Sequence, residues 1–346
     1  MASLAPAGDM TLMEREAAES ARAVERMLVA NQEGFRAIAE RLRESQPTSV
    51  ITCARGSSDH AATYAKYLIE TRIGIPVASA ALSVSSIYNA AVSPGNRVCL
   101  AISQSGRSPD LLAAVAEHRR SGAFVIALVN AEGAPLSDTA DVTIALDAGP
   151  EHSVAATKSY ICSLAAIAAL VGTWAQDAEM LEAVNKLPEQ LEAAWQLDWS
   201  PAVGAFVDAD NLFVVARGYG YGIAQEAALK LKETCAMHAE SFSAAEVRHG
   251  PMAIVGHSFN VLALGGSDLA GQSVRKAAEE FRKRGANLLI ADTDPGIADL
   301  PAIAAHPVIE PILMIASFYR MANALSLARG CDPDRPPHLN KVTETL

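Results

Sequence analysis

The sequence predicts an α/β protein made of two doubly wound units, each a parallel sheet covered by helices. Short apolar runs alternate with stretches of helical periodicity along most of the chain, the pattern of parallel strands joined by helical crossovers. The length of 346 residues suits two domains, and 50% of the residues are apolar, which is ample for a core. The two halves also resemble each other in sequence, which favours a duplicated unit.

The predicted elements follow one another in a regular order. Buried strands are expected at 49–54, 97–102, 123–129 and 142–147, and helices at 9–45, 58–72, 108–120 and, as a pair interrupted near 174–177, at 157–198. A second β/α series begins at residue 211. We therefore expect an N-terminal helical segment (1–45), a first domain (46–198), a second domain (199–330) and a C-terminal tail (331–346).

The internal similarity has a period of about 162 residues. "VITCARGSSDHAATYAKYLIE" opens the first series and "LFVVARGYGYGIAQEAALKLKE" opens the second, with Gly56 and Gly218 in the same place. Ser103 and Gly265 then each end an apolar run at the same distance from these glycines. At this point "SQSGRS" in the first copy is replaced by "GGSDLA" in the second, so we expect only the first copy to bind a ligand through hydroxyl groups.

Composition limits the possible partners and locations. The formal net charge of −11 excludes a global basic footprint for nucleic acid. The five cysteines form no CxxC and the histidines no HxxxH or HExxH, which indicates reduced thiols and no metal site. Because we find no secretion signal and no apolar run of membrane-spanning length, a cytoplasmic protein without membrane contact is expected.

The stretch "SQSGRSPD" lies where a strand passes into a helix. Ligands of open α/β sheets bind beyond the carboxyl ends of the strands, and the first turn of a helix attracts anions. Ser108 is placed to be the N-cap before Pro109, and the side chains that precede it can donate to a phosphate: Ser103, Gln104 and Ser105. The alternative is a serine-rich turn that only caps the helix.

Two further loops favour the phosphate interpretation. Ser57 and Ser58 follow another strand end, and "EHSVAATKSY" (151–160) again joins a strand to a helix, with Thr157 and Lys158 at the helix start. Three hydroxyl-bearing turns of one unit would meet at one edge of the sheet.

A second group of polar residues lies in 226–251. Glu226, Lys230, Glu233 and Met237 fall on one helical stripe, beside a stripe expected in the core. By itself this stripe could be a solvated face with weak Glu–Lys pairs, and the His249 that follows in "AEVRHGP" could be purely structural. Together they could also form an acid–base set near a sugar-phosphate site. The proline-rich tail could then carry Lys341 back over that site, although a frayed terminus is the default.

From about Met13 to the C-terminus the chain resembles the SIS (sugar isomerase) domain superfamily, in particular the isomerase module of glucosamine-6-phosphate synthase. The resemblance rests on "SQSG" (103–106), "VAATKS" (154–159), "EAALKLKE" (226–233), "HAESFSAAEVRHGP" (238–251) and the terminal "DRPPHLNK". It implies two tandem flavodoxin-like SIS domains. It also implies a homodimer with shared active sites and no metal or redox cofactor.

The resemblance assigns a role to each matching residue. The phosphate and neighbouring hydroxyls would be held by the substrate-binding residues Ser57, Ser58, Ser103, Gln104, Ser105, Ser108, Val154 and Ala155. Glu233 would move a proton between C1 and C2, and Lys230 would stabilise the developing enolate oxygen. His249, from the neighbouring subunit, would assist ring opening, and Lys341 would form a Schiff base with the ketose.

The implied activity is that of a glucosamine-6-phosphate deaminase (isomerising), which gives fructose 6-phosphate and ammonia. The chain has no counterpart of the synthase's glutaminase domain, so no glutaminase activity is expected. Other amino-sugar-phosphate deaminases, deglycases, aldose–ketose isomerases and a non-catalytic sugar-phosphate sensor remain alternatives. Departures from the synthase pattern at Arg55, Arg107 and Ala156 leave the exact sugar open.

Overall fold

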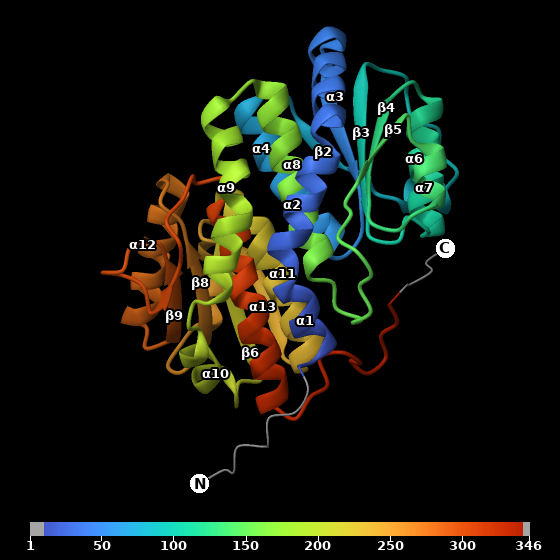
Figure 1. Cartoon of the computed structure of the whole chain (residues 1–346). Helices are drawn as coiled ribbons and strands as arrows, with labels where there is room; N and C mark the ends of the chain where they lie inside the picture. Colours follow the sequence, from blue (N-terminus) through green and yellow to red (C-terminus); the bar gives the residue numbers. More distant parts are fainter. Residues whose placement is uncertain (1–9, 342–346) are drawn as a thin grey trace.

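The computed structural model describes residues 10–341 and contains two five-stranded parallel sheets (Figure 1). The first sheet has the order β2-β1-β3-β4-β5 and the second the order β10-β9-β8-β6-β7. Numbered from its own first strand and counted from its β7 edge, the second sheet repeats the order of the first. The strands are β1 (Ser49–Cys53), β2 (Val77–Ser79), β3 (Arg97–Ser103), β4 (Phe124–Val129), β5 (Val142–Ala145), β6 (Asn211–Ala216), β7 (His238–Ser243), β8 (Asn260–Gly265), β9 (Asn287–Asp292) and β10 (Leu300–Pro301).

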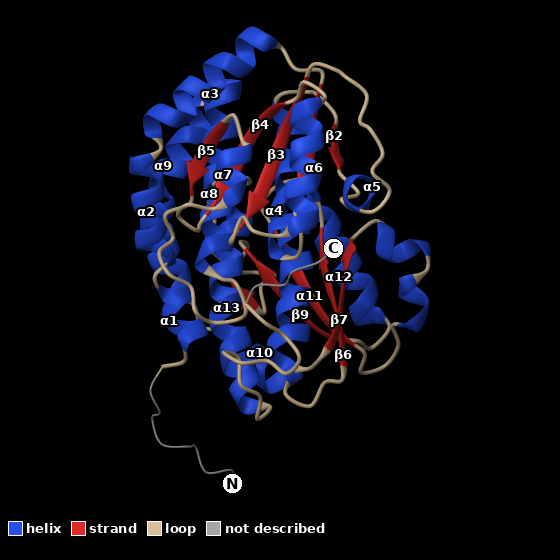
Figure 2. Cartoon of the chain, turned by 90° about the vertical axis from the view of Figure 1, so that its right-hand side faces the viewer, coloured by secondary structure: helices blue, strands red, loops and turns tan. Residues whose placement is uncertain are grey.

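Helices cover both faces of each sheet, and Figure 2 shows α6 in front of the upper sheet. The helices are α1 (Leu12–Ala18), α2 (Ser20–Ala30), α3 (Gln32–Ser45), α4 (Ser57–Arg72), α5 (Ser83–Ser86), α6 (Pro109–Arg120), α7 (Pro135–Thr139), α8 (Lys158–Ala175), α9 (Ala178–Trp195), α10 (Ser200–Phe206), α11 (Tyr221–Cys235), α12 (Leu269–Lys283) and α13 (Glu310–Ala328). Three 3₁₀ segments, η1 (Gly218–Gly220), η2 (Glu246–His249) and η3 (Pro251–Ile254), complete the set. The predicted two-domain α/β fold is therefore confirmed.

Three apolar clusters hold these layers together. In the first sheet, alternate strand residues face opposite sides, so that Cys99 and Val125 pack with α6 while Leu100 and Ile126 pack with α4 and α8. The second sheet packs one face against α12 and the other against α11 and α13. The largest cluster runs from α1–α4 through α8 and α9 to α11 and α13 without a break, so the two halves share one core.

The sequence prediction located the central strands to within about two residues but missed the short outer elements. β2 and β10 are edge strands of three and two residues, and the six-residue β7 (HAESFS) is an edge strand with little apolar patterning. The predicted helical stretch 9–45 is three helices with breaks at Glu19 and Asn31. The duplication is visible in the backbone: Gly56 (φ 53°) and Gly218 (φ 61°) both have positive φ directly after the first strand of their copy.

Two helices correct the prediction that no apolar stretch reaches the length of a membrane span. α8 and α13 are long and apolar enough by length and composition. However, 89% of the apolar window in α8 and 78% of that in α13 is buried inside the protein, as expected for central helices of a packed core. Location in the cytoplasm stays a prediction.

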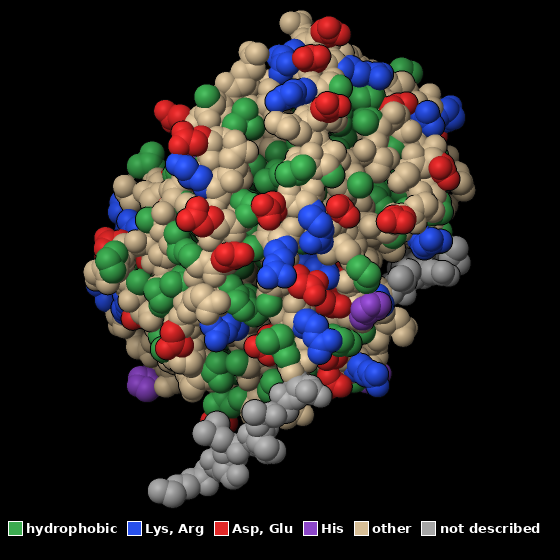
Figure 3. Space-filling model, in the orientation of Figure 1, with side chains coloured by type: hydrophobic (Ala, Val, Ile, Leu, Met, Phe, Trp, Pro, Cys, Tyr) green, Lys and Arg blue, Asp and Glu red, His purple; other side chains and the backbone are tan. Residues whose placement is uncertain are grey.

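The surface and the thiols agree with the composition. On the face drawn in Figure 3, acidic and basic side chains are interspersed and no continuous basic stripe is seen. All five cysteines are free thiols, and four of them are buried.

Candidate active site

A cavity of about 300 Å³ opens at the carboxyl ends of β1 and β3, where the sequence predicted a ligand site. Its wall is formed by the β1–α4, β3–α6 and β5–α8 loops, together with α11 and the C-terminal tail. The lining residues are Arg55, Gly56, Ser57, Ser58, Ile102, Ser103, Gln104, Ser105, Ser108, Leu111, Val154, Ala156, Glu233, Leu339, Asn340 and Lys341. The three turns therefore do converge, although the third reaches the cavity through Val154 and Ala156 and not through a hydroxyl. Two of the proposed catalytic residues, Glu233 and Lys341, share their cavity.

The β3–α6 loop is held in place by its own hydrogen bonds. The Ser103 hydroxyl accepts from the Gly106 amide at 2.9 Å, which closes the turn. Gly106 has φ 61°, and a Cβ there would lie 2.7 Å from the Cβ of Ala134, so only glycine fits. Ser108 occupies the N-cap position of α6, but its side chain makes no capping hydrogen bond. The expected capping role of the Ser108 hydroxyl is thus corrected, and that hydroxyl borders the cavity instead.

A charged pair joins two of the cavity loops. The Nε and Nη2 atoms of Arg55 lie 3.1 and 2.9 Å from Oδ2 of Asp110. Asp110, in the first turn of α6, is 2% exposed, and its Oδ1 accepts from the Leu111 amide at 2.8 Å. Asp110 is a partner of Arg55 that no motif in the sequence indicates.

The polar stripe of α11 is buried, so the solvated-face alternative is wrong. Lys230 is 1% and Glu226 0% exposed. The Lys230 ammonium lies 2.5 Å from Oε2 of Glu233, 3.4 Å from Oε1 of Glu226 and 3.2 Å from the Ser57 hydroxyl. Burial alone would lower the pKa of Lys230, but the Glu226 and Glu233 carboxylates outweigh it and raise that pKa above its usual value. Lys230 therefore stays charged directly behind Glu233.

Glu226 is the centre of a hydrogen-bond cluster between the two sheets. It accepts from the Ser57 hydroxyl at 3.1 Å and from the Tyr319 hydroxyl at 3.0 Å, and it lies 2.9 Å from Nδ1 of His60. Burial would raise the pKa of Glu226, but Lys230 and His60 outweigh it and lower that pKa. Sequence reasoning missed His60 and Tyr319. His60 could have been found because it lies one turn after Ser57 on α4.

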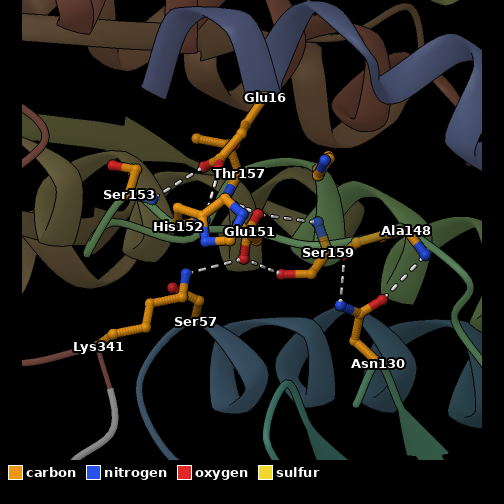
Figure 4. A network of polar contacts seen from close by, with 12 residues as sticks. Glu16, Ser57, Asn130, Ala148, Glu151, His152, Ser153, Thr157, Ser159 and Lys341 are labelled. Atoms are coloured by element: carbon orange, nitrogen blue, oxygen red, sulfur yellow. Dashed lines mark hydrogen bonds and ion pairs between the residues drawn. The ribbon is translucent and has the colours of Figure 1, made fainter. Parts of the chain in front are cut away.

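A second buried carboxylate, Glu151, holds the tail lysine (Figure 4). It is 0% exposed on its side chain and lies 3.1 Å from the Lys341 ammonium. It also accepts from the Thr157 amide at 2.9 Å and from the Ser159 hydroxyl at 2.7 Å. Burial opposes its ionisation, but Lys341, Thr157 and Ser159 together lower the pKa of Glu151 below its usual value.

Helix α1 supports both the loop and the tail at this place. The Glu16 carboxylate accepts from the amides of His152 and Ser153, and burial raises the pKa of Glu16. The Asp334 carboxylate accepts from the Leu12 and Met13 amides at 2.8 and 2.7 Å, at the first turn of the same helix. The tail is therefore anchored at Asp334, and this anchor brings Leu339–Lys341 onto the cavity.

Three of the predicted site residues, Lys230, Ala155 and His249, do not border the cavity of their own chain. Ala155 is 1% exposed and lies behind its neighbours Val154 and Ala156. His249 ends η2 and is exposed outside the cavity. Lys158 points away from it and pairs with Glu19 at 2.5 Å.

The second copy has lost the equivalent space. A void of only about 20 Å³ remains near Arg217, Gly266 and Asp268. The buried carboxylate of Glu310 accepts from the Ser267 amide at 2.8 Å, and Asp292 pairs with Arg275 at 2.6 Å. The Glu310 carboxylate thus borders the void of the second copy, whereas serines border the cavity of the first. That only the first copy binds a ligand stays a prediction.

Comparison with known proteins gives a family for both halves. The SIS domain family matches residues 44–172 and 205–319. The glutamine–fructose-6-phosphate aminotransferase (isomerizing) of Thermotoga maritima is 32% identical over 322 residues, which cover 87% of this chain and 52% of that protein. The chain thus spans about half the length of the curated relatives it matches.

Solved structures share the whole fold. A provisionally named phosphosugar isomerase of Silicibacter pomeroyi DSS-3 is 40% identical, with a TM-score of 0.89, over 94% of this chain and 100% of that one. The C-terminal domain of glucosamine-fructose-6-phosphate aminotransferase from Francisella tularensis is 24% identical (TM-score 0.85; 96% and 100% covered). The glucosamine-6-phosphate deaminase of Thermotoga maritima is 21% identical (TM-score 0.76; 97% and 100% covered). The last two likenesses concern the fold alone.

Proposed function

The chain belongs to the SIS domain family, and we propose that it is a glucosamine-6-phosphate deaminase (isomerising) that gives fructose 6-phosphate and ammonia. One observation carries the proposal: Glu233, Lys341 and the serines of the β1–α4 and β3–α6 loops line the same cavity, with the Lys230 ammonium directly behind Glu233. This arrangement offers an anion cradle, a carboxylate and two ammonium groups within one site.

Proton transfer is the task of Glu233 in this proposal. Its carboxylate takes the C2 proton of the open-chain sugar and delivers it to C1. The barrier falls because the Lys230 ammonium and the cavity hydroxyls stabilise negative charge that develops on the substrate. The product of this transfer is the C2 imine of the ketose, whose hydrolysis by water releases ammonia and fructose 6-phosphate.

Lys341 acts at the carbonyl carbon. Its amine can form a Schiff base with the ketose only after it leaves Glu151, to which it is bound in the structure. Departure of Lys341 leaves the buried Glu151 carboxylate without the cation that does most to lower its pKa, while the Thr157 amide and the Ser159 hydroxyl still donate to it. Glu151 thereby becomes an acceptor for another cation, such as the ammonium group of the substrate or product.

We further propose a homodimer with shared active sites. His249 is exposed and outside the cavity of its own chain, and it therefore remains available to complete the site of a second copy. In that place it would assist ring opening of the sugar.

A substrate panel tests the function. The protein is incubated with glucosamine 6-phosphate, galactosamine 6-phosphate, N-acetylglucosamine 6-phosphate and glucose 6-phosphate, and ketose phosphate and ammonia are assayed separately. Glu233→Gln protein serves as the control for contaminating activity. Ammonia with fructose 6-phosphate from glucosamine 6-phosphate is expected. Binding without turnover of any sugar would contradict an enzyme.

A pure aldose–ketose isomerase is the second candidate. It is favoured by the 40% identical protein of known structure, which is named a phosphosugar isomerase. In the panel this activity would give ketose phosphate without ammonia.

A further inference from the structure

Among the described residues that line the cavity, Arg55 is the charged side chain of the two serine-bearing loops. It follows β1, it lies next to Ser57 and Ser58 in the cavity wall, and its side chain is 57% exposed. Within residues 10–341, both of the hydrogen bonds that its guanidinium donates go to a single oxygen, Oδ2 of Asp110. A guanidinium group has five N–H donors in a planar fork, so three of them remain for another partner.

Because of Asp110, the N-terminus of α6 alone would be a poor anion site. It is the second residue of α6, after Pro109, which has no amide hydrogen. The Asp110 carboxylate accepts from the amide of the third helical residue, Leu111, at 2.8 Å. It also places a nearly buried negative charge in the first turn of α6, next to the serines of the β3–α6 loop. A phosphate arriving at Ser105 and Ser108 would be repelled by this carboxylate if it were not neutralised.

We propose that Arg55 is a phosphate-binding residue that Asp110 orients: the guanidinium neutralises Asp110 and donates its remaining N–H groups to the phosphate of the sugar. The inference rests on the proposed function in that the ligand is a sugar phosphate. Asp110 is a positioning residue, because it acts through Arg55. Serine hydroxyls alone would supply hydrogen bonds but could not neutralise the Asp110 carboxylate, whereas Arg55 does both, in a geometry that suits phosphate oxygens.

The alternative is that Arg55 and Asp110 form only a structural ion pair between the β1–α4 loop and α6. Such a pair would matter for stability and not for the ligand. Arg107 provides a matched control, because it lies in the β3–α6 loop but is exposed and outside the cavity wall.

The test measures binding by calorimetry, with glucosamine 6-phosphate and, separately, inorganic phosphate as probes. The proteins are wild type, Arg55→Ala, Arg55→Lys, Arg107→Ala and the double variant Arg55→Ala/Asp110→Asn, each with a thermal melt. We expect Arg55→Ala to weaken binding of both probes about 10- to 100-fold, the range for a lost hydrogen bond to a charged group. Arg55→Lys keeps the charge but not the fork and should lie between Arg55→Ala and wild type.

The double variant separates neutralisation from direct contact. Because it removes the repelling carboxylate, it should bind phosphate several times more tightly than Arg55→Ala, and Arg107→Ala should bind within about twofold of wild type. Wild-type affinity in Arg55→Ala protein that melts as a folded chain would overturn the inference. Equal loss in Arg55→Ala and Arg107→Ala would overturn it as well. If wild type binds inorganic phosphate but not glucosamine 6-phosphate, the proposed function fails, and the phosphate series still decides the role of Arg55.

Discussion

The Lys230 ammonium lies 2.5 Å from Oε2 of Glu233, three positions further along α11, and through this contact it lies directly behind a residue of the cavity wall. Lys230 is buried behind this contact, whereas the Glu233 side chain is 20% exposed and reaches the cavity wall. Lys230 also keeps a second carboxylate, Glu226, at 3.4 Å. The pair is thus arranged so that Glu233 can exchange a proton with a ligand while the charge of Lys230 remains compensated.

Glu233→Gln should therefore abolish chemistry without unfolding the protein. The substitution keeps the shape and removes the base, so substrate affinity should change little and the chemical step should fall at least about 100-fold. The measurement is solvent-deuterium exchange at C2 of bound sugar, alongside a melting curve. If exchange continues at the wild-type rate in a stable variant, Glu233 is not the base, and Glu240 or Glu246 becomes the next candidate. A purely structural salt bridge would show lower stability and nearly normal turnover.

The phosphate cradle leads to a second prediction, in which the two serines differ. Ser105→Ala should raise KM about tenfold or more and leave the melting temperature almost unchanged, since no hydrogen bond of the fold is assigned to its hydroxyl in residues 10–341. Ser103→Ala should also lower stability, by about 1–3 kcal/mol, because it leaves the Gly106 amide without its acceptor. Steady-state kinetics and thermal melts on the single variants separate the two effects. If the double variant Ser103→Ala/Ser105→Ala binds sugar phosphate as tightly as wild type, the β3–α6 loop is only a turn.

Complementation tests the proposed sharing of sites between subunits. Glu233→Gln and His249→Ala proteins, each inactive, are mixed under conditions that exchange subunits. A mixed dimer has one site with both wild-type residues, so up to about a quarter to a half of the wild-type activity should return, depending on the extent of exchange. The control is each variant exchanged with itself. Mixed dimers without any recovered activity would show that His249 does not complete the site of a neighbour.

The sequence was most informative where a single segment determines the structure. Runs such as Val98–Ile102 can only be buried strands, and the carboxyl ends of parallel strands must meet at one edge, so the meeting of Ser58 and Ser105 followed from pattern alone. The spacing of Glu226, Lys230 and Glu233 likewise placed them on one side of a helix. Their burial did not follow, because it depends on α4 and α13 packing against that side.

Partners that are distant in the chain could not be predicted from it. Glu16 and His152 are 136 residues apart, and Tyr319 reaches Glu226 across 93 residues. "EHSVAATKSY" was identified as part of the site through its hydroxyls, whereas Glu151 at its first position holds the tail lysine. The packing of helices and loops decides which carboxylate a lysine binds, and local sequence periodicity does not predict it.

The Glu151–Lys341 pair gives a prediction for the pH dependence of stability. Because the pKa of Glu151 is depressed in the folded protein, its ionised form stabilises the fold at pH values above the usual Glu pKa of 4.5. This contribution is lost as the pH falls through the lower, folded-state pKa. Glu151→Gln removes the titrating group and leaves the Lys341 ammonium without its carboxylate. The variant should therefore be less stable than wild type at pH 7, by about 1–3 kcal/mol, and the difference should shrink below pH 4.5.

Urea unfolding at several pH values between 3 and 8 measures this difference directly, and subtraction of the variant cancels the other carboxylates that titrate in the same range. Glu182→Gln is a suitable control, because Glu182 pairs with Lys186 on the exposed side of α9, where an i,i+4 pair contributes little. Its unfolding curve should follow that of wild type at every pH. A stability difference for Glu151→Gln that stays constant from pH 3 to 8 would mean that Glu151 is not ionised against Lys341 in the folded protein. The catalytic consequence is separable, since the freed Lys341 remains tethered by the Asp334 anchor on α1 and still lies at the cavity.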